Sequence, residues 1–144
     1  MRIISGNYRG KKIFIPKDKN TRPLRDMVKE SIFNLIEHSK KININIEDSN
    51  ILDLFSGSGS FGLECISRGA NKVTFIENYP LILNILKKNI DLLNAKKSSN
   101  IIEKNCFDVL NSEKFSNSKF KIIFLDPPFQ EKKINSLLNR IQEM

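Results

Sequence analysis

The chain has 144 residues, of which 40% are hydrophobic and 28% are charged, and its formal net charge is +8. The length fits one domain, and the composition is typical of a soluble globular protein. No apolar run approaches the roughly 20 residues that cross a bilayer, and the start has neither signal-peptide nor transit-peptide character. These features exclude a membrane-spanning chain, and we expect a cytoplasmic protein.

The positive charge is concentrated at the N terminus. Residues 1–29 contain nine lysines and arginines against two aspartates, a net charge of +7. A concentrated basic segment attracts a polyanion and releases its counterions, so nucleic acid is the expected partner. The alternative is a lysine-rich composition that only forms a solvated face. The proposed RNA-binding residues are Arg2, Arg9, Lys11, Lys12, Arg22 and Arg25.

The first predicted element is a β-hairpin in residues 1–15, where two strand-like runs flank Gly6, Asn7 and Gly10. Residues 16–23 contain two prolines and four charges, which predicts a loop.

An amphipathic helix is predicted over residues 24–39. Its apolar positions at helical spacing are Met27 or Val28, Ile32, Leu35 and Ile36. His38 matches no functional pattern and is expected to be exposed at the helix end.

From residue 50 the sequence alternates between strands and helices. Helices are predicted within 61–70 and 79–95 and after residue 129, and residues 108–115 form a short helix or a loop. Strands are predicted at 51–55, 72–77, 99–105 and within 119–129. Such alternation predicts an α/β doubly wound parallel sheet, which binds ligands beyond the carboxyl ends of its strands. The last strand has an almost wholly apolar centre, so we expect it to be buried on both faces.

Two cysteines, Cys65 and Cys106, stand alone in sequence, and His38 is the only histidine. This inventory predicts buried, reduced thiols and no metal site.

The most informative stretch is Asp53-Leu-Phe-Ser-Gly-Ser-Gly-Ser-Phe-Gly62, a strand that turns through glycines into a helix. Glycines let the backbone reverse and approach a ligand. The spacing also fits a dinucleotide site, with Glu77 holding a ribose, and a purely structural turn is a further possibility.

Acidic residues near the glycines help to choose the cofactor. Asp53 would repel a pyrophosphate but suits the cationic end of S-adenosylmethionine. Glu77 can accept hydrogen bonds from both ribose hydroxyls. Asp108 is positioned to accept from an adenine amine beside Cys106 or Phe107, or it is simply a helix N-cap.

The last strand ends in Asp126-Pro127-Pro128-Phe129, which indicates the reaction. Two prolines fix an extended backbone and remove two N–H donors, which leaves an acceptor-rich site. The Asp126 carboxylate and the Pro127 carbonyl can accept both hydrogens of an exocyclic base amine and aim its lone pair at a methyl carbon. Phe129 can stack on the base.

The segments M-R-I-I-S-G-N-Y-R-G-K-K, T-R-P-L-R-D-M-V-K-E-S-I-F-N, L-D-L-F-S-G-S-G-S-F-G-L-E and D-P-P-F together resemble the bacterial RsmD family. These are methyltransferases of guanine N2 in 16S ribosomal RNA. The resemblance covers essentially the whole chain. It implies a Rossmann-like fold over residues 1–144, with residues 1–49 as a basic hairpin and helix extension and residues 50–144 as a partial core. It also implies S-adenosylmethionine as the donor and small-subunit RNA or particles as the acceptor.

The resemblance also implies residue roles. Arg22, Pro23 and Asp26 would border the cleft, and Asp126, Pro127, Pro128 and Phe129 would act on the base. The expected cofactor-binding residues are Asp53, Phe55, Gly57, Ser58, Gly59, Glu77, Asn78 and Asp108.

In one respect the sequence departs from the family, whose sheet continues beyond the D-P-P-F strand. Only one amphipathic helix follows here, so we expect a sheet that stops at its fourth strand, as in a truncated member. An apolar edge strand invites pairing with another chain. The expected state is a monomer unless that edge pairs.

Three alternatives stay open on the sequence. Asp-Pro-Pro-Phe also suits adenine N6 in DNA or RNA, and a non-catalytic relative would still bind RNA. A nicotinamide-dependent oxidoreductase is disfavoured by Asp53, by D-P-P-F and by the lack of a substrate domain.

Overall fold

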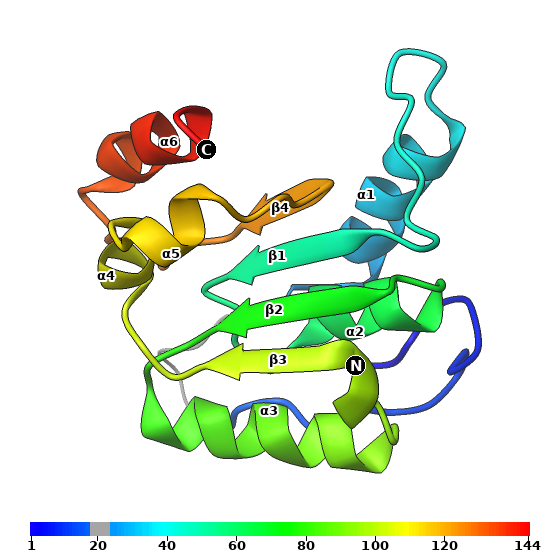
Figure 1. The fold of residues 1–144 in the computed structure, drawn as a ribbon. Coiled ribbons are helices and arrows are strands. Elements are labelled where there is room, and N and C mark those ends of the chain that lie inside the picture. The colour runs from blue at the N-terminus through cyan, green and yellow to red at the C-terminus, as the bar shows by residue number, and fades with distance from the viewer. Residues whose placement is uncertain (18–23) are drawn as a thin grey trace.

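The computed structural model describes residues 1–17 and 24–144 (Figure 1). Its strands are β1 (Asn50–Leu54), β2 (Lys72–Ile76), β3 (Ser99–Ile102) and β4 (Ile122–Leu125). Its α-helices are α1 (Asp26–His38), α2 (Ser60–Ser67), α3 (Pro80–Leu92), α4 (Cys106–Leu110), α5 (Glu113–Ser116) and α6 (Ile134–Gln142). A 3₁₀ turn, η1 (Lys96–Ser98), precedes β3. Among these residues, no helix has the length and apolar character needed to cross a membrane.

The four strands form one parallel sheet in the order β3-β2-β1-β4. At the end of β1, Leu54 is in register with Ile76 of β2 and with Leu125 of β4. The carboxyl ends of the strands therefore meet along one edge of the molecule, on the left in Figure 1. The predicted α/β doubly wound fold is confirmed.

Each face of the sheet has its own core, because successive strand residues point to opposite faces. Ile51, Val73 and Phe75 contribute to the core that also contains residues of the N-terminal segment and of α1, α2 and α3. Leu52, Leu54 and Ile76 belong to the second core, which includes residues of α4, α5 and α6. Figure 1 shows α2 behind the sheet and α4, α5 and α6 near its carboxyl edge.

The prediction that the last strand is buried on both faces is wrong. All four residues of β4 are half-buried. β4 is an edge strand of the sheet: among the described residues it pairs with β1 on one side and has no paired strand on the other, which leaves its side chains partly exposed. The apolar run correctly predicted a strand, but it does not determine how many neighbours a strand has.

The inward face of α1 matches the prediction only in part: Ile32 and Ile36 pack against the core, as predicted, but the other predicted apolar positions are exposed. Met27 and Leu35 are 78% and 58% exposed, whereas Lys29 and Phe33 are buried. Phe33 stacks on Phe61 of α2, with ring centroids 5.1 Å apart. His38 is exposed at the helix end, as predicted.

Residues 1–15 form an antiparallel ribbon, called the N-terminal ribbon below. Its two arms are joined at the single bridge between Arg2 and Lys12, and Ile3 and Ile13 enter the core. The predicted hairpin is therefore present, with one bridge in place of two regular strands.

A buried carboxylate on α2 fixes the ribbon to the sheet layer. Glu64 accepts hydrogen bonds from the amides of Ile4 and Ser5, each 2.9 Å long, and pairs with Lys29 and Arg68. Burial lowers the pKa of Lys29, and the Glu64 carboxylate opposes that effect. Lys29, counted above as part of the basic segment, is thus unavailable to nucleic acid.

Candidate active site

The turn between β1 and α2 is held in an unusual backbone conformation. Phe55, Gly57 and Gly59 have positive φ values of 55°, 56° and 82°. A non-glycine residue rarely adopts this region, and such strained residues often occur at ligand-binding sites. The segment Phe55–Gly59 is called the glycine turn below.

The two glycines of the turn serve different purposes. A Cβ on Gly59 would lie 2.5 Å from a methyl carbon of Leu86 on α3, so this glycine allows the turn to rest on that helix. A Cβ on Gly57 would meet only the Phe55 carbonyl oxygen, at 3.9 Å. The space beside Gly57 is therefore open to a ligand, as the predicted cofactor site requires.

Asp53 is almost completely buried, with 1% exposure, and its carboxylate accepts a 3.0 Å hydrogen bond from the amide of Gly62. Gly59, the N-cap of α2, has no side chain to satisfy the helix amides, so Asp53 supplies the missing acceptor from the end of β1. Burial raises the pKa of Asp53 to about 8; the Gly62 amide opposes this shift, and the nearby Asp126 and Glu77 add to it.

Glu77 follows β2 and binds the glycine turn. One carboxylate oxygen accepts from the amide of Gly57 at 3.0 Å, and the other accepts from the amides of Asn78 and Tyr79. Glu77 is half-buried, and the oxygen that accepts from Gly57 has a second lone pair that none of these bonds uses. It can therefore hold the turn and still accept hydrogen bonds from a ligand hydroxyl.

The residues after β3 lie beside the turn. Cys106 is buried, and burial raises its pKa to about 11, an effect that the Phe55 amide opposes. Asp108 is exposed within α4, whose N-cap is Asn105, with its side-chain oxygen accepting from the Phe107 amide. The alternative in which Asp108 caps the helix is wrong, since Asn105 has that role.

Asp126, Pro127, Pro128 and Phe129 follow β4 at the same edge. Partial burial raises the pKa of Asp126. The Pro128 carbonyl accepts a turn hydrogen bond from the Glu131 amide, and Phe129 is 98% exposed. An almost fully exposed aromatic ring next to a carboxylate is a suitable platform for a flat ligand.

The predicted site residues thus fall into two groups. The carboxyl edge brings together the ends of β1, β2, β3 and β4 and the residues that follow them. Asp53 lies in the last part of β1, and the charges of Glu77 and Asp126 act on it. The ribbon cations Arg2, Arg9, Lys11 and Lys12 are exposed elsewhere. Arg25 is exposed next to α1, Asp26 is half-buried, and Arg22 and Pro23 lie outside the described residues.

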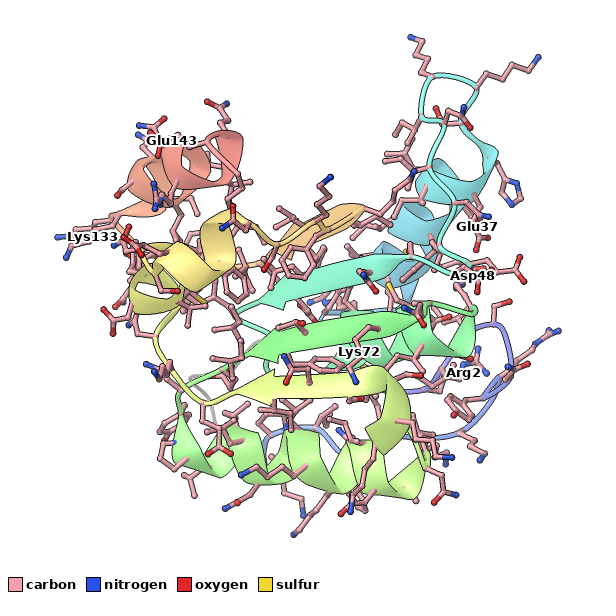
Figure 2. All side chains as sticks on the ribbon, in the orientation of Figure 1. Arg2, Glu37, Asp48, Lys72, Lys133 and Glu143 are labelled. Atoms are coloured by element: carbon pink, nitrogen blue, oxygen red, sulfur yellow. The ribbon has the colours of Figure 1, made fainter. Side chains whose placement is uncertain are left out.

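The tip of the N-terminal ribbon, residues 6–9, and the glycine turn lie at opposite ends of α2. The amides of Asn7 and Tyr8 bind Ser67, the last residue of α2, whereas the glycine turn precedes Ser60, its first residue. Eight helical residues span about 12 Å. Figure 2 shows Arg2 and Lys133, which precedes α6, on opposite sides of the molecule.

Cys65 and Cys106 are both buried and free, as predicted. Within residues 1–17 and 24–144, no three His, Cys, Asp or Glu side chains are grouped closely enough to hold a metal ion.

Comparison with known proteins gives concordant matches. The family model described as Conserved hypothetical protein 95 matches residues 1–144. Ribosomal RNA small subunit methyltransferase D of Haemophilus influenzae is 38% identical over 90% of this chain, and that of Escherichia coli K12 is 32% identical over 99%. The chain spans 64% and 67% of the length of these two relatives, respectively.

Solved structures agree with the sequence matches. A structure of the Escherichia coli protein yhhF, assigned as a methyltransferase, has a TM-score of 0.82 and 32% sequence identity, and covers 99% of this chain and 72% of its own. A Haemophilus influenzae methylase structure has a TM-score of 0.73 at 35% identity and covers 99% of this chain and 72% of its own. The predicted Rossmann-like methyltransferase fold is confirmed.

Proposed function

Because this chain belongs to the RsmD family of ribosomal RNA small subunit methyltransferases, we propose that it methylates the exocyclic N2 of a guanine in 16S ribosomal RNA, with S-adenosylmethionine as donor. The observation that carries the proposal is the meeting of two segments at one sheet edge. The glycine turn follows β1, the Asp126–Phe129 segment follows β4, and these strands are direct neighbours.

The glycine turn supports the choice of cofactor. Its Gly57 leaves space for a ligand, and Glu77 beside it offers carboxylate oxygens to ribose hydroxyls. The carboxylate of Glu77, which binds the turn, adds negative potential there and favours a cationic ligand over a pyrophosphate. A cationic ligand would also favour ionisation of Asp53, whose pKa burial raises to about 8. When bound, S-adenosylmethionine would supply an electrophilic methyl carbon on a sulfonium.

The Asp126–Phe129 segment supplies the groups that would act on the base. An exocyclic amine is a poor nucleophile because its lone pair is delocalised into the ring. Accepting its hydrogens at the Asp126 carboxylate and the Pro127 carbonyl would favour tetrahedral nitrogen and direct the lone pair toward the methyl carbon. Phe129, being almost fully exposed, would stack on the extruded base.

The distance between the ribbon cations and the carboxyl edge supports a large substrate. A ligand that touches Arg9 or Lys11 and also reaches Phe129 must extend along α2 and beyond it, which a single nucleoside cannot do. A folded ribosomal RNA or a small-subunit particle is large enough.

The decisive experiment is incubation with labelled S-adenosylmethionine and small-subunit particles lacking the modification, followed by nucleoside digestion. We expect labelled N2-methylguanosine. Asp126→Ala should abolish the label and leave RNA binding intact, whereas Asp91→Ala, an exposed change on α3, should affect neither. Labelled N6-methyladenosine would instead support adenine methylation, and RNA binding without any label would support a non-catalytic relative.

A further inference from the structure

Asn89 on α3 links two segments that are distant in sequence. Its side chain is fully buried, its oxygen accepts from the Phe14 amide at 2.8 Å, and its nitrogen donates to the Phe14 carbonyl at 2.9 Å. The same nitrogen donates to the carbonyl of Ser58 in the glycine turn at 2.9 Å. One side chain therefore joins the N-terminal ribbon to the glycine turn.

Burying an amide is costly unless its hydrogen bonds are made, and asparagine is a weak helix former. Here both amide hydrogens and the carbonyl oxygen have partners. The pair of bonds with Phe14 copies the exchange between two strands of a ladder, so Asn89 acts as a substitute strand for the ribbon. Such complete hydrogen bonding indicates that Asn89 has a specific role and is not merely a polar residue tolerated in the core.

The turn needs support from outside. Phe55, a residue with a side chain, has a φ of 55°, and such a strained conformation persists only when the surroundings hold it. Leu86 lies under Gly59, and Asn89 is one helical turn further along the same face of α3. Leu86 supports the turn by steric contact at Gly59, and Asn89 supports it by the hydrogen bond to the Ser58 carbonyl.

We propose that Asn89 is a positioning residue that holds the glycine turn in its cofactor-binding conformation, with the N-terminal ribbon at Phe14 as its anchor. The cofactor part of this inference rests on the proposed function. Its direct consequence is that a change at Phe14, on the ribbon, alters affinity at the glycine turn through Asn89.

Two substitutions at Asn89 separate the hydrogen bonds from the packing. Asn89→Asp keeps the shape and the acceptor for the Phe14 amide, but removes the donor to Ser58 and places an acceptor against two carbonyl oxygens. Asn89→Ala removes all three bonds. We expect both variants to bind S-adenosylhomocysteine roughly tenfold more weakly in calorimetry, the effect of losing one buried hydrogen bond. Asn84→Ala, an exposed change on the same helix, is the matched control and should bind like the parent.

A second readout needs no ligand. Hydrogen exchange of the free protein should show faster exchange at the glycine-turn amides in the Asn89 variants, with β2 remaining protected. Phe14→Pro, which removes the ribbon's N–H and keeps its carbonyl, should reproduce the loosening of the turn from a distance. This variant keeps the inference testable if a change at Asn89 prevents folding.

The outcomes separate the two proposals. If the parent protein fails to bind S-adenosylhomocysteine, the proposed cofactor is wrong, and exchange at the turn still tests the positioning role. If the parent binds but the Asn89 variants bind equally well with a protected turn, the inference is overturned. Uniformly faster exchange over the whole sheet, with unchanged affinity, would mean a purely structural role and would overturn it too.

Discussion

The ammonium group of Lys29 and the carboxylate of Glu64 lie 3.3 Å apart, and neither side chain is exposed to solvent. Lys29 also donates to the carbonyl of Arg2 and to the hydroxyl of Ser60, the first residue of α2. The pair therefore joins α1, the N-terminal ribbon and the helix that follows the glycine turn. Buried charges are tolerated only while their partners are in place.

Removing either partner of this pair should destabilise the fold. We expect Lys29→Met to lower the free energy of unfolding by about 3 kcal/mol. Glu64→Leu should lower the free energy of unfolding further, because it leaves a buried ammonium and the amides of Ile4 and Ser5 without an acceptor. Urea denaturation measures both. Lys87→Met, which breaks a solvent-exposed pair with Glu103, is the control and should cost less than about 1 kcal/mol. Equal losses for Lys29→Met and the control would contradict this view.

The two glycines of the turn should respond differently to alanine. Gly59→Ala places a methyl group 2.5 Å from a methyl carbon of Leu86 at a φ of 82°, so it should lower the unfolding temperature. Leu86→Ala empties a buried site and is destabilising by itself, so the contact predicts that the double variant loses less stability than the sum of the two single losses. Gly57→Ala meets no steric clash and should lose less stability than Gly59→Ala, although the φ of 56° strains a residue with a Cβ by about 1 to 2 kcal/mol. Its methyl group would occupy the proposed ligand space. We expect Gly57→Ala to lose S-adenosylhomocysteine affinity at least tenfold, about 1.4 kcal/mol. A stable Gly57→Ala variant with unchanged affinity would place the cofactor elsewhere.

Asp53 should make stability depend on pH. Burial raises its pKa in the folded protein from 3.8 to about 8, so the folded state favours the protonated form. The contribution of protonated Asp53 to the free energy of unfolding is fully present below pH 3.8 and declines as the pH rises to about 8. The decline is at most roughly 1.4 kcal/mol per pH unit. Asp53→Asn keeps an acceptor for the Gly62 amide but has no titrating carboxyl group, so its stability should not show this decline. Denaturation measured between pH 4 and 9 should show the free energy of unfolding of Asp53→Asn rising relative to that of the parent as the pH increases. Parallel pH profiles for the two proteins would refute the assignment.

Phe129 should matter for substrate and not for folding. Its ring is 98% exposed, so Phe129→Ala should leave the unfolding temperature unchanged. Loss of stacking on the base should weaken RNA methylation by about 1 to 3 kcal/mol in kcat/KM, and Phe129→Trp should restore activity. A control substitution, Leu138→Ala on α6, removes an exposed apolar side chain outside the proposed site. Equal kcat/KM values for Phe129→Ala and the control would show that the Phe129 ring takes no part in the reaction.

The ribbon cations should control salt dependence. Replacing Arg9, Lys11 and Lys12 together by glutamine removes three exposed charges from the ribbon. If each contacts a phosphate, the slope of log Kd for RNA against log salt concentration should fall by about 2 to 3. Replacing Lys40, Lys41 and Lys88 together, all exposed and outside the ribbon, is the matched control for a change of three charges. An identical slope change in both variants would indicate a non-specific charge effect.

Several elements were predictable because their signals are local. The glycine turn, the helix starting at Pro80 and the strand before Asp126 all appear where the periodicity predicts them. The carboxyl-edge location of Asp53, Glu77 and Asp126 then follows from a parallel sheet. The inward face of α1 was predictable only in part, since an apolar stripe through Met27 and Leu35 gives no sign that Lys29 is the residue turned inward.

The sequence by itself determined the order of strands and helices, the sharp turn at Gly57 and Gly59, and the acceptor-rich segment after Asp126, because each depends on neighbouring residues. The tertiary structure decided how polar groups pair across the chain. Glu64 binds the ribbon amides, Asp53 serves the amide of Gly62, and Asn89 joins Phe14 to Ser58. Buried polar groups must find partners, and which partners come within hydrogen-bonding distance is known only once the helices are packed on the sheet.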